Sequence, residues 1–245
     1  SIDIDRLLSS IIYDPAKKRA VFRKSALSVL QSVVDGRNYL YRWIFAHHKI
    51  VYNQYLIKTA VKKLASLISP ENSDLFLSNF FSCDALVKDV DIGGGISVHL
   101  PTDQDLTVLL KNHRKDIPEA EEYLFRTHRC KPLWKTSVEF SRLFREHSSP
   151  QLDYIVAHAK DALAAMLGKT PEDSGIIVEP IPEKTVSIRT GDIFIQLDKE
   201  SHSYNHILDV KNSSEPKNAF YVFVPNAVIE RKQELIEKLQ TMGPS

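Results

Sequence analysis

The sequence predicts a mainly α-helical protein with an N-terminal β-hairpin and a small α+β C-terminal lobe. Three observations lead to this prediction. Apolar residues recur at helical spacing through most of residues 25–168. Two β-rich runs flank a turn near the N-terminus, and further short β-rich runs separated by turn residues follow residue 175. We therefore expect two domains, residues 1–168 and residues 169–245.

The N-terminal elements are a hairpin and a helix. Residues 11–24 read IIYDPAKKRAVFRK, in which the runs IIY and AVF flank a turn at Asp14-Pro15. Leu27, Leu30 and Val34 then recur at the spacing of a helix. Residues 1–14 are interpreted as a strand that leads into the hairpin.

The longest periodic stretch covers residues 38–68, and its pattern breaks near His47-His48-Lys49. It predicts a long helix that Pro70 stops, because proline cannot continue a helix. A shorter helix is expected over residues 71–81. Gly93-Gly94-Gly95 is interpreted as a flexible connection, because no Lys-Ser/Thr follows it and the next residues, ISVHL, resemble a strand.

The bounds of the remaining helices are predicted from residues typical of helix ends. Thr102 is expected to cap a helix that begins at Asp103, and Pro118 begins another helix. Further helices are expected over residues 136–147 and 152–167, the second ended by Gly168. The runs IIVEPIP, TVSIRT, DIFIQL and AFYVFVP predict strands, and Asn226 is expected to cap the closing helix.

Composition excludes several classes of function. The chain has 32 basic and 31 acidic residues, a net charge of +1, so no overall field attracts nucleic acid or an anionic membrane. No apolar run approaches the roughly 18 residues that a membrane helix needs. Cys83 and Cys130 form no CxxC motif, which is typical of free thiols in a reducing cytoplasm. We expect a cytoplasmic protein without a membrane partner, and nucleic acid is not an expected partner.

The sequence contains no complete active site of a familiar kind. Its nine histidines form neither HExxH nor HxH, and no GxSxG nucleophile motif is present. His47 and His48 are adjacent, and neighbouring residues on a helix point about 100° apart, so the two rarely bind one metal. The pairs Glu121-Glu122 and Asp103-Asp105 occupy helix starts, where compensation of the helix dipole explains them.

One stretch stands out. Residues 36–49, GRNYLYRWIFAHHK, contain three cations, two histidines and four aromatic residues. Such a mixture suits a phosphorylated aromatic ligand, because guanidinium groups bind phosphate oxygens and rings stack on bases or pack against sugars. The alternative is an amphipathic helix with buried aromatic residues and solvated cations, and composition alone favours that alternative.

With its surroundings, this stretch resembles the region after the catalytic centre in HD-domain deoxynucleoside triphosphate (dNTP) triphosphohydrolases, which include dGTPase-like and SAM-and-HD-type proteins. A strand pair and a helix at residues 11–35 come first, and R-N-x-L-x-R at 37–42 runs into Phe45-Ala46-His47-His48-Lys49. T-D-Q-D-L at 102–106 and K-P-L-W-K at 131–135 follow in the family's order. The resemblance implies a helical HD-associated region with the hairpin in residues 1–168 and an α+β lobe after it.

The resemblance also implies roles for individual residues. Arg37 matches an arginine that contacts the substrate triphosphate, and Phe45 matches a position where a tyrosine usually packs against the deoxyribose. His47 matches a histidine near a second, effector nucleotide, with His48 or Lys49 standing for a neighbouring lysine. Ala46 replaces a polar residue, so no base preference is implied.

The family's catalysis needs a His…His-Asp…Asp set around a divalent metal. No His-Asp dipeptide occurs in the sequence. Asp3-Ile4-Asp5 resembles the last metal-binding segment, but Leu8 and Ser9 stand where an aspartate and a tyrosine should follow, so Asp5 is left out of the site. The ligands of the expected divalent metal would therefore lie outside this sequence.

Three hypotheses follow. In the first, the chain is the C-terminal part of a dNTP triphosphohydrolase, which converts a dNTP to a deoxynucleoside and triphosphate, as a homo-oligomer or completed by an HD-containing polypeptide. In the second, it is a non-enzymatic nucleotide-sensing or protein-interaction module. In the third, the 36–49 stretch binds single-stranded nucleic acid, which the near-neutral charge opposes.

Overall fold

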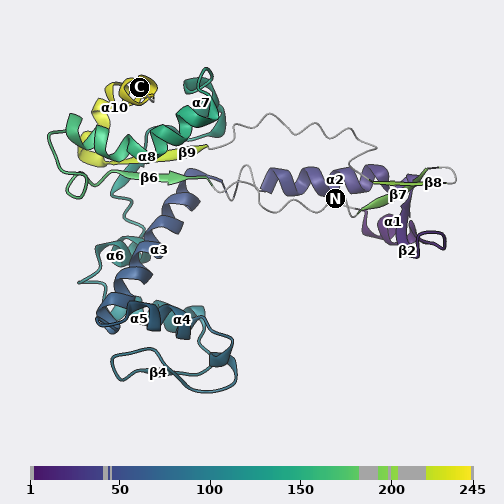
Figure 1. Cartoon of the computed structure of the whole chain (residues 1–245), viewed down its shortest axis with the longest axis horizontal. Helices are drawn as coiled ribbons and strands as arrows, with labels where there is room; N and C mark the ends of the chain where they lie inside the picture. The colour runs from purple at the N-terminus through teal and green to yellow at the C-terminus, as the bar shows by residue number, and fades with distance from the viewer. Residues whose placement is uncertain are drawn as a thin grey trace.

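The computed structural model describes residues 3–40, 44, 46–181, 193–197, 200–203 and 219–243, and of Arg37, Asn38, Glu200 and Ser203 it describes only the backbone. The protein is mainly α-helical with an additional α+β component, as the sequence predicts (Figure 1). The described elements form three groups, each with a hydrophobic cluster of its own.

The N-terminal group joins two distant parts of the chain. Strands β1 and β2 form the predicted hairpin, and β2 pairs in parallel with β7 from far along the sequence (Figure 1). Residues 4–9 form a helix rather than the expected strand, because the Asp3 carboxylate accepts the Arg6 N–H at 2.9 Å and caps it. The elements are α1 (Ile4–Ser9), β1 (Ile11–Asp14), β2 (Arg19–Arg23), η1 (Lys24–Ala26), α2 (Leu27–Leu40), β7 (Phe194–Leu197) and β8 (Glu200–Ser203).

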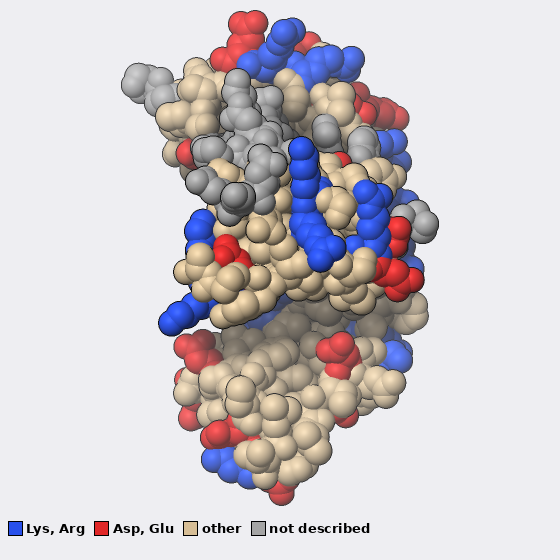
Figure 2. Space-filling model, turned by 90° about the vertical axis from the view of Figure 1, so that its right-hand side faces the viewer, with Lys and Arg blue, Asp and Glu red and all other residues tan. Residues whose placement is uncertain are grey.

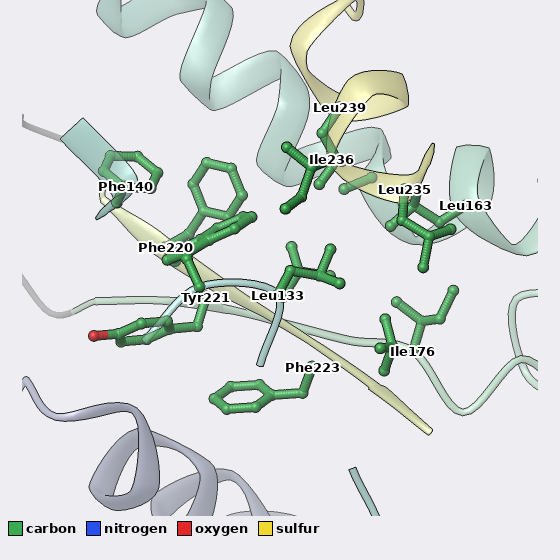
Figure 3. Packing of buried hydrophobic residues seen from close by; sticks show 14 of the residues in the cluster. Leu133, Phe140, Leu163, Ile176, Phe220, Tyr221, Phe223, Leu235, Ile236 and Leu239 are labelled. Atoms are coloured by element: carbon green, nitrogen blue, oxygen red, sulfur yellow. The ribbon is translucent and has the colours of Figure 1, made fainter. Parts of the chain in front are cut away.

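The largest cluster surrounds an antiparallel sheet of order β5-β9-β6. Strand β9 is buried along almost its whole length, as its apolar sequence FYVFVP predicts. Side chains from α8 and α10 meet those of the sheet (Figure 3). The elements are β5 (Cys130–Pro132), α7 (Ser137–Leu143), α8 (Ser149–Met166), β6 (Ile177–Pro180), β9 (Phe220–Pro225), η5 (Asn226–Arg231) and α10 (Lys232–Gln240).

Helix α3 (His48–Ile68) links that cluster to a third group of elements. Its first turns pack Val51, Tyr52 and Leu56 into the sheet cluster, whereas its second half packs against α4, α5 and α6. One long helix therefore contributes buried residues to the hydrophobic clusters of both groups. The other elements are α4 (Ser73–Phe80), η3 (Asp84–Leu86), β3 (Val90–Asp91), β4 (Ser97–Val98), α5 (Asp103–Asn112) and α6 (Pro118–Phe125).

Most of the predicted end signals are confirmed. Gly93, Gly94 and Gly95 all have positive φ in the turn between β3 and β4, and Gly168 follows α8 with φ +66°. The predicted N-cap at Asn226 is wrong. Its side-chain amide donates to the His128 carbonyl at 3.2 Å, and residues 226–231 form a 3₁₀ helix before α10 begins. The expected strand TVSIRT lies outside the described residues.

The described strands of residues 169–245 do not form one separate sheet. β7 and β8 extend the N-terminal hairpin, and β6 and β9 pair in a sheet that also contains β5. Each of these two sheets therefore contains strands from both sides of the proposed boundary at residue 168. The division into two domains at that residue stays a prediction.

The surface shows no field of one sign on the face seen in Figure 2, where Lys and Arg side chains alternate with Asp and Glu. This matches the near-zero net charge. Among the described helices, none combines the length and apolarity needed to cross a bilayer.

Candidate functional site

The candidate site lies at the start of α3, where the predicted break at His47-His48 falls. His47 has extended backbone angles, and its Nδ1 accepts the Lys49 N–H at 3.3 Å, so the side chain caps the helix. The His47 carbonyl accepts the N–H groups of Ile50 and Val51 at 2.8 and 3.1 Å. The aligned peptide dipoles of α3 give this helix end a partial positive charge.

Hydrogen bonds connect this helix start to the segment after β5. His48 Nδ1 lies 3.1 Å from the Lys135 carbonyl oxygen. Since a carbonyl only accepts, Nδ1 carries the hydrogen, and Nε2 is the ring nitrogen left for another partner. The Tyr221 hydroxyl, at 3.0 Å, donates to the Ala46 carbonyl and also lies 3.5 Å from the Lys135 oxygen. The blocks 46–49 and 131–135, far apart in sequence, thus meet.

Buried neighbours fix the positions of these groups. Leu133 and Trp134 are fully buried, and the Leu133 N–H donates to the Val222 carbonyl at 2.9 Å, which places Lys135 where the chain returns to the surface. Tyr221 belongs to β9, and its hydroxyl points away from the aliphatic side chains of the cluster (Figure 3). We call His47, His48, Lys49, Lys135 and Tyr221 the α3-start cluster.

The α3-start cluster carries the cations of Lys49 and Lys135, and one carboxylate lies beside it, because Glu139 Oε2 accepts the Lys135 N–H at 2.8 Å. Lys49 and Lys135 are exposed, and neither forms an ion pair with any residue that the structure describes. Burial lowers the pKa of His48, and the charges of His47, Lys49 and Lys135 lower it further, against the opposing effect of the Lys135 carbonyl. Burial and the Glu139 carboxylate raise the pKa of Tyr221 to about 12, so its hydroxyl stays a donor.

The pKa of His48 gives a first prediction. Because it is lower in the folded protein than its ordinary value of about 6.5, the unfolded chain binds more protons at acidic pH. The contribution of His48 to stability is therefore present above pH 6.5 and lost as the pH falls through the lowered folded pKa. We expect urea unfolding of wild type to show this loss and His48→Asn to show less of it. An NMR titration giving a His48 pKa above 6.5 would contradict the described environment.

The structure describes neither side chain of the two predicted substrate contacts, Arg37 and Phe45. Phe45 lies outside the described residues. Arg37 lies in α2, and its side chain is not described. Within the described ranges, no three His, Cys, Asp or Glu side chains gather in a way that could hold a metal ion.

The T-D-Q-D-L block has a structural explanation of its own. Asp105 Oδ2 accepts the Thr102 N–H at 2.7 Å, and Thr102 Oγ1 accepts the Asp105 N–H at 3.4 Å, which makes a capping box at α5. Helix α5 packs in the third group of elements and is not a part of the α3-start cluster.

Sequence reasoning missed one polar residue near this region. Glu122, which was interpreted with Glu121 as compensation of the helix dipole, is 5% exposed, and it accepts hydrogen bonds from the Tyr52 hydroxyl and the Arg129 N–H. Glu121 is partly exposed and pairs with the Arg129 guanidinium at 3.0 Å. Helical periodicity gives no signal that Glu122 faces inward, because its apolar neighbours Ala120 and Leu124 lie two residues away and therefore on a different face of the helix.

Comparison with known proteins gives a fold likeness. No protein-family model matches the sequence, and no curated protein matches it. The crystal structure of a hypothetical protein from Aquifex aeolicus, at 2.0 Å resolution, is similar with a TM-score of 0.57 and 15% sequence identity. The similarity covers 96% of this chain and 51% of that chain, so the present chain spans about half the length of that structure. At this identity the likeness shows the fold alone.

Proposed function

We propose that this chain is the nucleotide-contacting C-terminal part of an HD-type dNTP triphosphohydrolase. In that reaction water attacks the α-phosphorus, the bond from this phosphorus to the 5′ oxygen breaks, and a deoxynucleoside and triphosphate are released. The observation that supports the proposal best is the meeting of residues 46–49 and 131–135 at the α3-start cluster. These are two of the blocks on which the resemblance rests.

The chemistry of the cluster suits a polyphosphate. Lys49 and Lys135 offer ammonium groups that form no ion pair with a described carboxylate, and the first turn of α3 adds a partial positive charge. His48 Nε2 becomes a further donor when the ring is protonated, and a bound anion would favour that form. In this proposal His47, His48 and Lys49 contact an effector nucleotide.

The substrate contacts are assigned by resemblance. Arg37 would bind the substrate triphosphate, and Phe45 would pack against the deoxyribose. The divalent metal would supply activated water, and its ligands would come from polypeptide outside this sequence. We propose that this polypeptide precedes the chain in a longer protein or belongs to a partner, within a homo-oligomer or a mixed assembly.

The experiment combines the chain with an HD-containing polypeptide, by fusion ahead of residue 1 or as a separate chain. Mg²⁺ or Mn²⁺ and a mixture of the four dNTPs are added, and inorganic triphosphate is measured by phosphorus NMR. We expect release only when both polypeptides and a metal are present. Arg37→Ala should lower kcat/KM by about 100-fold, because it removes a charge-assisted hydrogen bond to the substrate. Lys49→Ala should raise the dNTP concentration for half-maximal activation about tenfold, because it removes a charge-assisted hydrogen bond to the effector.

A matched control distinguishes these effects from a general loss of charge. Lys111 is exposed at the end of α5, and Lys111→Ala should leave the rate unchanged. Full activity of the Arg37→Ala variant would count against the assignment. Saturable dNTP binding to this chain without metal, and without triphosphate release in the combined system, would instead support the nucleotide-sensing module.

A further inference from the structure

A separate cavity opens between α3, α6, α8 and the chain before β6. Its volume is about 330 Å³, enough for a small organic molecule. Tyr52 and Tyr55 from α3 line it, together with the apolar residues Ile176 and Pro225. None of the α3-start cluster residues lines it.

Glu122 of α6 also lines this cavity, although it is 5% exposed. Its Oε1 accepts the Tyr52 hydroxyl at 2.7 Å and the Arg129 N–H at 2.6 Å. Burial and the contact with Glu122 raise the pKa of Tyr52, so Tyr52 remains the donor in this bond. The hydrogen bonds that Tyr52 and Arg129 donate to Glu122 end on Oε1, and Oε2 is not a fully buried unpaired atom, so Oε2 is the oxygen accessible to a molecule in the cavity.

The surrounding charges favour a positive ligand. Glu119 pairs with Lys63 at 2.7 Å, and Arg129 pairs with Glu121 at 3.0 Å, so these charges at the cavity offset one another. Glu122, Glu172 and Lys160 line the cavity without an ion pair among the described residues, which leaves an excess of one negative charge. Buried carboxylates seek a charged or strongly donating partner.

We propose that this cavity binds a small organic cation, an ammonium or guanidinium group on a short apolar stem. Its N–H groups donate to Glu122 Oε2, and its stem lies against the rings of Tyr52 and Tyr55, which also favour a cation at their faces. The inference goes beyond the proposed function and does not rest on it, since it uses neither the α3-start cluster nor a nucleotide.

The two cysteines provide the test in the unaltered protein. Cys130 lines the cavity and is partly buried, whereas Cys83 is exposed and lies outside the cavity lining. Burial raises the pKa of the Cys130 thiol, so iodoacetamide should alkylate it more slowly than Cys83. Agmatine carries both a guanidinium and an ammonium group. If only the unoccupied protein reacts, agmatine at about 80% occupancy or more should slow alkylation of Cys130 at least about fivefold. The rate at Cys83 should not change, and mass spectrometry of the two peptides measures both.

Charge variants test whether the Glu122 carboxylate is responsible for the protection of Cys130 by agmatine. Glu122→Gln keeps an acceptor for Tyr52 and Arg129 but removes the charge, and it should weaken agmatine protection by roughly tenfold or more in concentration. Glu71→Gln, a change at an exposed carboxylate outside the cavity lining, should leave protection intact. Pentanoate, an anion of similar length, should give none. Absence of protection by agmatine in the wild type, or equal protection by pentanoate, would overturn the proposal.

Discussion

Replacement of Trp134 by alanine is expected to lower the free energy of unfolding by about 3–5 kcal/mol, as large-to-small changes in packed cores do. Trp134 is fully buried, and its ring lies 5.4 Å from those of Phe144 and Phe220 and 5.8 Å from that of Phe140, between centroids. Its Nε1–H donates to the Phe220 carbonyl at 2.9 Å, so the variant also leaves that acceptor unpaired. Urea unfolding followed by circular dichroism measures the change.

Trp134→Phe serves as the control, because it keeps an aromatic ring and loses the indole donor. Its expected cost is about 1–2 kcal/mol. If Trp134→Ala cost less than 1 kcal/mol, the aromatic cluster around β9 would not be packed as described. The outcome also matters for the α3-start cluster, because Trp134 immediately precedes Lys135, whose carbonyl binds His48.

Replacement of Glu122 by alanine is the second large effect, an expected loss of about 2–4 kcal/mol. The change leaves the Tyr52 hydroxyl and the Arg129 N–H without their acceptor in a buried environment, and an unpaired buried group costs about 1–3 kcal/mol. Glu122→Gln keeps an acceptor at this position and should cost about 1 kcal/mol. Thermal and urea unfolding of the three proteins measure the difference.

A double-mutant cycle with Tyr52→Phe tests the cause. If the Tyr52–Glu122 hydrogen bond carries much of the loss, Tyr52→Phe combined with Glu122→Ala should cost less than the sum of the two single changes. Additive losses would mean that Glu122 stabilises the fold by another route.

The fold was largely predictable because most helix ends carry local signals. Thr102 and Gly168 fix helix ends through hydrogen bonds or backbone angles that depend on near neighbours, and both predictions are confirmed. Asn226 looked equally suitable as a cap. Its amide instead bonds to His128, 98 residues away, a contact that no local pattern contains.

Sheet pairing and the candidate site also depend on contacts between residues that are far apart in the sequence. The parallel pairing of Phe22 with Ile195 joins segments that the sequence assigns to different lobes. Likewise, Tyr221 had no local feature to separate it from the other aromatic residues of β9, yet its hydroxyl bonds to Ala46, 175 residues away. Sequence analysis did select His47, His48 and Lys49, but only the structure shows Lys135 and Tyr221 beside them.

The central claim is that the α3-start cluster contacts a polyphosphate. The most direct measurement is an NMR titration of the His48 ring from pH 5 to 8, without and with inorganic triphosphate. An anion bound beside Lys49 and His48 should raise the pKa of His48 in a saturable way, by about one unit, and Lys49→Ala should reduce the shift. A His48 titration that triphosphate leaves unchanged at millimolar concentration, with Lys49 intact, would contradict the claim.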